Sequence, residues 1–151
     1  MPGIHALTGC DYTPTFYKKG KKKPYNLLQN SEKYQRAFAD LINLTSENSM
    51  HVFTVLEEFV CRIYNEKQIN EVSEVRLHIF SRTYKANDIF EIFKKKLKNL
   101  DASSFPPCKT ELAQQLLRTL YITNIWRNAY LHSTNLHPTQ YGWKKSMNNI
   151  K

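Results

Sequence analysis

The chain has 151 residues, with 22 Lys and Arg against 13 Asp and Glu, which gives a formal net charge of +9. This length suits one domain, and a hydrophobic content of 41% supplies enough apolar side chains for a core. No apolar run approaches the ~20 residues that span a bilayer, and the N-terminal segment lacks the apolar stretch of a signal peptide. We therefore expect a folded intracellular protein with no membrane partner.

Three widely spaced cysteines, Cys10, Cys61 and Cys108, predict reduced thiols rather than a disulfide framework. His132 and His137 have the spacing of part of a zinc finger, but the close cysteine pair that a finger needs does not occur. We therefore expect no zinc.

The sequence predicts a mainly α-helical protein. No glycine occurs from position 21 to position 141, whereas strand hairpins usually need glycine at their turns. Apolar residues recur at spacings of three and four along most of this interval. The predicted helices cover residues 31–44, 49–66, 73–82, 87–98 and 110–131. The alternation of Val75, Leu77 and Ile79 would also suit a strand, and we prefer a helix because of its neighbours.

These patterns predict a small bundle of about five to six helices, preceded by a basic loop. We expect a single helical domain over residues 1–132, with the loop in 1–30 and the bundle in 31–132. Residues 133–151 would form a polar C-terminal tail without periodicity. Trp143 in this tail would either pack over the core or remain free.

The most informative stretch is N-terminal, where a turn of small residues leads to Asp11. A carboxylate in such a turn can bind a hard divalent ion such as Mg²⁺. Shortly after it, Gly20 lies within a run of five of the 22 basic residues: Lys18, Lys19, Lys21, Lys22 and Lys23. Backbone N–H and ammonium groups in this run can bind phosphates. The stretch would thus place a metal beside a nucleic-acid backbone.

Residues 9–28 resemble, without a gap, flap-endonuclease-like nucleases of the PIN-like superfold. In that family a Gly-x-Asp-Tyr turn carries the last acidic metal ligand. A helix-hairpin-helix loop with Gly-x-Gly-x-Lys follows, and then a helix that grips duplex DNA. The resemblance implies that Asp11 is a ligand position for Mg²⁺ or Mn²⁺ and that Gly20 is the second hairpin glycine. It also implies that Lys22 and Lys23 lie next to DNA phosphates.

The chain departs from the family pattern at two positions of this loop and at its start. Lys18 stands where the family has its first hairpin glycine, a position that favours glycine if its φ is positive. Pro24 falls in the first turn of the next helix, where proline is tolerated. The family's other metal-binding carboxylates lie upstream of the turn, and this chain begins at Met1 just before it. We therefore expect a catalytically incomplete C-terminal part of a larger nuclease-like protein.

A second resemblance covers later parts of the chain. Phe105-Pro106-Pro107, the predicted helix with Trp126 and the segment Tyr141-Gly142-Trp143 resemble the C-terminal part of uncharacterised, mobile-element-associated animal proteins. Those proteins share the His-Ala-x-Thr-Gly-Cys-Asp turn. This resemblance implies no further chemistry.

The leading expectation is a DNA-binding or other nucleic-acid-binding protein, nuclear rather than cytoplasmic, that holds the sugar-phosphate backbone through residues 18–23. As an isolated chain it would not be an enzyme, and no catalytic residue is assigned. The lysines at 94, 95, 96 and 98 would form either a solvated helix face or a second contact. The alternative is a helical protein-interaction module, or a relic without function, whose lysines keep it soluble.

Overall fold

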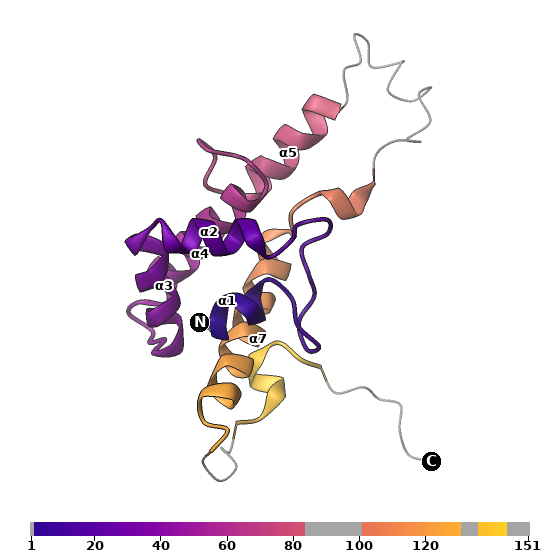
Figure 1. The fold of residues 1–151 in the computed structure, drawn as a ribbon. Helices are drawn as coiled ribbons and strands as arrows, with labels where there is room; N and C mark the ends of the chain where they lie inside the picture. Colours follow the sequence, from indigo (N-terminus) through magenta and orange to yellow (C-terminus); the bar gives the residue numbers. More distant parts are fainter. Residues whose placement is uncertain (1, 84–100, 131–135, 145–151) are drawn as a thin grey trace, which may run out of the picture.

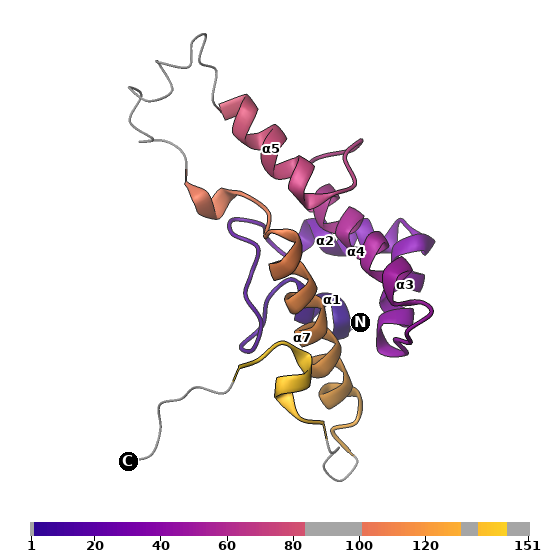
Figure 2. The ribbon, with the colours of Figure 1, turned by 180° about the vertical axis from the view of Figure 1, so that it is seen from behind.

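A computed structural model describes residues 2–83, 101–130 and 136–144 (Figures 1 and 2). Within these residues the chain is mainly helical and has no strand, which confirms the predicted fold class. The α-helices are α1 (Pro2–Leu7), α2 (Lys22–Gln29), α3 (Glu32–Ile42), α4 (Ser49–Ile63), α5 (Val72–Thr83) and α7 (Lys109–Arg127). Two short 3₁₀ helices are η1 (Ala102–Ser104) and η2 (Pro138–Tyr141). The helix predicted over 87–98, with its lysines, and His132 lie outside the described residues.

Four of the predicted helices agree with the structure to within a few residues. Ser31 caps α3 as expected, because its side-chain oxygen accepts a hydrogen bond from the Tyr34 N–H. The segment that also suited a strand is helical as α5, where Val75 is buried while Leu77 points outward and is exposed. The alternation of Val75, Leu77 and Ile79 in the sequence therefore does not correspond to the two faces of a strand. The six-residue α1 was not predicted, because it is too short to show a helical period and contains Gly3.

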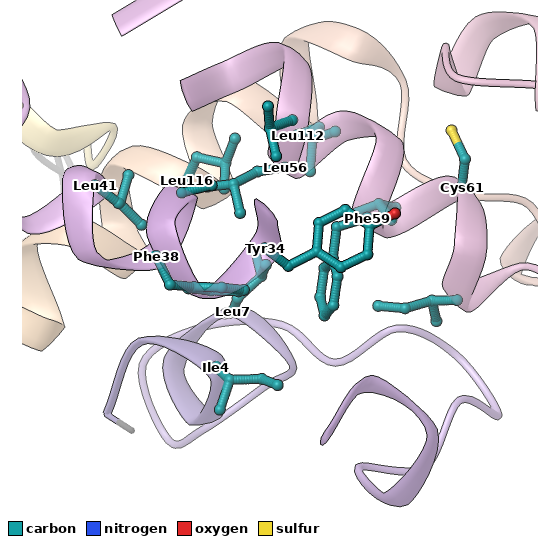
Figure 3. Close-up of a cluster of buried hydrophobic side chains, with 14 of the residues drawn as sticks. Ile4, Leu7, Tyr34, Phe38, Leu41, Leu56, Phe59, Cys61, Leu112 and Leu116 are labelled. Atoms are coloured by element: carbon teal, nitrogen blue, oxygen red, sulfur yellow. The ribbon is translucent and has the colours of Figure 1, made fainter. Parts of the chain in front are cut away.

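The core lies where α1, α3, α4 and α7 meet (Figure 3). Phe59 of α4 is fully buried, and its ring packs edge-on against Phe38 at 5.4 Å and Tyr34 at 5.1 Å between ring centroids. Leu112 and Leu116 of α7 belong to the same cluster. Truncation of a buried Phe to Ala typically costs ~3–5 kcal/mol, so contacts of this kind set the stability of the bundle.

Residues 136–144 pack against α7, although the tail shows no periodicity in the sequence. The Trp143 ring lies 5.1 Å from the Tyr121 ring, and the Arg118 guanidinium lies over it at 5.7 Å. Arg118 also donates a hydrogen bond to the Gly142 carbonyl at 2.8 Å. Of the two alternatives for Trp143, the structure thus shows packing on the bundle. No helix in the described residues is long and apolar enough to cross a bilayer.

The buried carboxylate of Glu57 joins three helices. Its side chain is on α4, where the residue is 2% exposed, and it accepts a hydrogen bond from the Val72 N–H at 3.1 Å. Val72 is the first residue of α5, where a negative charge is favourable. The Lys109 ammonium at the start of α7 lies 3.6 Å from the other oxygen of Glu57. This carboxylate therefore fixes where α5 and α7 begin relative to α4.

A second carboxylate, Glu58, joins α4 to α3. It accepts hydrogen bonds from the Lys33 ammonium and from the Tyr34 hydroxyl at 3.0 Å, and the Arg62 guanidinium lies 3.5 Å away. Burial alone would raise the pKa of Glu58, but the hydrogen bonds from Lys33 and Tyr34 and the two positive charges outweigh it, so this pKa is lowered. Burial, together with the Glu58 hydrogen bond, raises the pKa of Tyr34 to about 12.

The lowered pKa of Glu58 predicts an acid-dependent loss of stability. The stabilisation from this carboxylate is present above the unfolded-state pKa of about 4.3 and is lost as the pH falls through the lower folded-state pKa. We expect Glu58→Gln to lower the free energy of unfolding by roughly 1–2 kcal/mol at pH 7. Urea denaturation of both proteins from pH 7 down to about pH 3 should show the difference shrinking toward the acid end.

A matched control is Glu32→Gln, which breaks an ion pair with Arg36 whose side chains are 82% and 78% exposed. Exposed pairs of this kind contribute little, so this variant should change stability by less than about 0.5 kcal/mol at any pH. A Glu58→Gln difference that stays constant across the pH range contradicts the assignment.

Candidate nucleic-acid interface

The turn that carries Asp11 is closed by its own backbone. After α1 the chain reverses through a bridge between Cys10 and Thr13, with N···O distances of 3.1 and 3.3 Å. The Thr13 hydroxyl donates a hydrogen bond to the Ala6 carbonyl and so fastens the turn to α1. Gly9 has φ +110°, and a Cβ there would lie 2.8 Å from the Thr15 Cα. Only glycine fits this position. The tip of the turn, at Asp11 and Tyr12, is exposed.

A side chain of helix α7 fixes this turn by hydrogen bonds. The buried side chain of Gln115 donates one hydrogen bond to the Leu7 carbonyl at 2.8 Å and another to the Pro14 carbonyl at 3.1 Å. Leu7 ends α1 and Pro14 follows the turn, so a single amide fixes both ends of the reversal. The turn and the loop after it are thereby positioned against α7 (Figure 1).

Asp11 is exposed at the tip of the turn. The neighbouring Cys10 thiol lies 3.2 Å from the Thr13 hydroxyl. Within the described residues, no group of three or more His, Cys, Asp or Glu side chains could hold a metal ion. Mg²⁺ requires several oxygen ligands in near-octahedral geometry, and Asp11 supplies one carboxylate. The described residues therefore do not fit a Mg²⁺ or Mn²⁺ site.

The loop before α2 has its strained residue at Lys18, which adopts φ +52°, in the left-handed region that favours glycine. In the flap-endonuclease-like nucleases that residues 9–28 resemble, the first hairpin glycine stands at the position of Lys18. The turn is closed by a 2.9 Å hydrogen bond from the Lys19 N–H to the carbonyl of Phe16, whose ring is buried. Gly20 is exposed, and a Cβ there would meet no atom within 4 Å. A ligand can therefore approach the backbone closely at Gly20.

The lysines of this loop differ in what they contact. Lys18 Nζ lies 4.9 Å from the centre of the Tyr17 ring, and Lys19 Nζ lies 4.7 Å from that of Tyr64, so both charges are held over aromatic faces. Lys22 is exposed in the first turn of α2, and no hydrogen bond or ion pair to it is found in the described part of the chain. Lys22 is thus the lysine most available to a ligand.

Lys23, which was predicted to contact nucleic acid, has a structural role. Its ammonium donates hydrogen bonds to the Ile63 carbonyl at 2.9 Å, at the end of α4, and to the Asn65 side chain. A positive charge at the C-terminus of a helix is favourable. Burial lowers the pKa of Lys23, and the positive charge of Lys19 lowers it further. Lys23 therefore anchors the loop and α2 to α4.

The surface around the start of α2 is hollowed. Lys21 at the N-cap position has no side-chain hydrogen bond that caps the helix, so the first N–H groups of α2, those of Lys22 and Lys23, have no capping partner, and Pro24 after them has no N–H. A hollow of about 550 Å³ runs along the same helix. Its lining residues are Gly20, Lys22, Lys23, Asn26, Leu27, Asn30, Ser31 and Tyr34. Helix N–H groups, ammonium groups and an open hollow together form a surface that can bind phosphate.

The structure also brings residues to this surface that the sequence did not indicate. Lys21 Nζ lies 2.6 Å from His5 Nδ1, and the His5 ring packs against that of Trp126 with 5.6 Å between centroids. These residues lie far apart in the chain, so no local pattern could have linked them. The candidate interface thus includes part of α1 and the end of α7.

Comparison of the chain with models of known protein families, with curated protein sequences and with solved structures finds no match.

The geometry of Gly9 predicts a large effect of adding one methyl group. Gly9→Ala would strain the positive φ and push against the Thr15 backbone, so we expect a loss of roughly 2–3 kcal/mol in the free energy of unfolding. Thermal and urea unfolding followed by circular dichroism would measure it. Gly20→Ala is the matched control, because its Cβ enters open space, and it should change stability by less than about 0.5 kcal/mol. Equal effects of the two variants would show that the turn does not have this conformation.

Proposed function

We propose that this chain binds nucleic acid through the sugar-phosphate backbone, with residues 18–23 and the first turn of α2 as the contact surface. The observation that carries the proposal is the group of five lysines beside the N-terminus of α2. Among the described residues, none of these lysines forms an ion pair with a carboxylate. The hydrogen bonds from Ser103 chiefly lower the pKa of Asp101, and the nearby charge of Lys18 contributes, so one carboxylate lies in the field of this lysine. The remaining excess of positive charge at the helix N-terminus favours an anionic partner.

Four of the five ammonium groups are assigned to phosphate contacts: Lys18, Lys19, Lys21 and Lys22. Lys23 is excluded from this set because the end of α4 and the Asn65 side chain already occupy it. On duplex DNA each phosphate contact contributes about −0.9 to the slope of log affinity against log salt concentration, so four contacts give roughly −3.6. Contacts of this kind position a protein on DNA but do not read its sequence.

The resemblance to flap-endonuclease-like nucleases supports the same surface, since in that family the helix after the loop grips duplex DNA. We extend the proposal to its origin: a catalytically incomplete, nuclear relative of such nucleases, of the mobile-element-associated kind. Asp11 would then correspond to a former metal-ligand position.

Charge reversal in the loop tests the binding surface. Lys18→Glu combined with Lys22→Glu should reduce affinity for a duplex roughly 10- to 100-fold and make the salt slope less negative by about 2. Fluorescence anisotropy over roughly 50 to 200 mM salt would measure both quantities. The matched control is Lys67→Glu with Lys144→Glu, two exposed lysines outside the loop, which imposes the same change in net charge. Equal losses in the two double variants would contradict a localised interface.

A cleavage assay tests the inactive state separately. Branched DNA incubated with the chain and Mg²⁺ or Mn²⁺ should remain intact, because one carboxylate cannot hold the two ions that assist in-line phosphodiester hydrolysis. Asp11→Ala serves as the control for contaminating nuclease. Cleavage by the unmodified chain that disappears in Asp11→Ala would overturn this part of the proposal.

A second candidate function is binding of a protein partner, favoured by an apolar groove of about 370 Å³ between α3, α4 and α7. Met50, which is 75% exposed, lines it together with Leu44, Phe53 and Leu117. For this candidate, Met50→Asp would abolish partner binding, whereas the charge reversals in the loop would not affect it.

A further inference from the structure

Two basic side chains are in direct contact beside the candidate interface. Lys21 Nζ lies 2.6 Å from His5 Nδ1, and both residues are exposed. A neutral imidazole can accept a hydrogen bond from the ammonium group through Nδ1, whereas a protonated imidazole cannot. This contact therefore holds two nitrogen bases together at one point of the surface. An anion could be bound there by both side chains at once.

The two side chains lie at a hollow of about 380 Å³ between α1 and α2. Its lining residues are Ile4, His5, Thr8, Lys21, Lys22 and Tyr25. Among these described residues there is no carboxylate, while three of them carry a basic nitrogen and Tyr25 carries a hydroxyl. The Trp126 ring of α7 packs against the imidazole and restricts its orientation. The site is thus a preformed, basic and partly apolar pocket.

We infer that this hollow binds a phosphomonoester group, either at the end of a nucleic-acid strand or in a small phosphate compound. A phosphomonoester carries a charge near −2 and three acceptor oxygens, whereas each internucleotide phosphate carries a single charge. The ammonium groups of Lys21 and Lys22 match the larger charge, and bonds between charged donors and phosphate oxygens are strong. The neutral His5 imidazole, which accepts from Lys21 through Nδ1, carries an Nε2–H as a further donor. This site goes beyond the proposed backbone contacts, which need no strand end.

The chemistry gives the site a specific pH dependence. The titratable groups that line the hollow with His5 are Lys21 before α2, and Lys22 and Tyr25 on α2. The second ionisation of a phosphomonoester lies near pH 6. Affinity for a phosphomonoester therefore rises with pH through this ionisation, as the dianion forms.

Intrinsic fluorescence of Trp126 provides a direct test. In the full chain carrying Trp143→Phe, so that Trp126 is the remaining tryptophan, inorganic phosphate is titrated from pH 5 to pH 8 (roughly the range around the second ionisation of a phosphate group). We expect a saturable change in fluorescence, with an affinity that rises with pH over this range as the phosphate dianion forms. His5→Gln should weaken binding roughly tenfold across the range. His51→Gln, an exposed histidine on α4, should leave the profile unchanged.

Anisotropy with three duplexes of one sequence identifies the source of the phosphate: 5′-phosphorylated, 3′-phosphorylated and unphosphorylated. Tighter binding of one phosphorylated duplex assigns the site to that strand end. A response to inorganic phosphate without such a preference assigns it to small phosphate compounds. No response of Trp126 to phosphate, together with equal affinity for all three duplexes, overturns the inference. Failure of the backbone proposal would differ, because the unphosphorylated duplex would not bind while the phosphate response remained.

Discussion

The side-chain amide of Gln115 is the interaction on which the candidate interface depends. From the middle of α7 it donates hydrogen bonds to the Leu7 and Pro14 carbonyls, which lie at the two ends of the turn around Asp11. These carbonyls belong to a segment that reverses direction and cannot satisfy them within a helix. Because Gln115 is buried, its loss would leave the two acceptors without a partner, at a cost of roughly 1–3 kcal/mol for each unsatisfied group. The basic loop that follows is held at its first end by the two hydrogen bonds of Gln115. At its other end it is held by the hydrogen bond from Lys23 to the last residue of α4.

This arrangement explains how a loop of lysines can be ordered without losing its charge to internal ion pairs. One lysine, Lys23, is used to anchor the loop, and two others, Lys18 and Lys19, are oriented by the faces of Tyr17 and Tyr64. The carboxylates that stabilise the fold, Glu57 and Glu58, instead act between helices. The positive charge of the loop is therefore directed to solvent at the start of α2, where the helix dipole adds to it.

The sequence predicted the helices whose apolar spacing repeats over several turns, such as α4 and α7, because burial of one face determines them. It also located the basic surface, since its lysines are neighbours in the chain. The positive φ of Lys18 was indicated only by the resemblance, in which a glycine stands at this position, because a lysine by itself gives no sign of a left-handed conformation. Nor could the sequence show that Lys23 hydrogen-bonds to the end of α4 or that Gln115 hydrogen-bonds to both ends of the turn. Those roles arise from contacts across 40 and more than 100 residues, which no local pattern records.

The central claim is that the loop and the first turn of α2 form the nucleic-acid contact. The most direct measurement is an amide chemical-shift titration of the ¹⁵N-labelled chain with an unphosphorylated duplex. The account predicts that the largest changes map to residues 18–26, with small changes at Met50 and Leu117 in the apolar groove. Large changes confined to the groove, or the absence of any changes on addition of duplex at low salt, would contradict it.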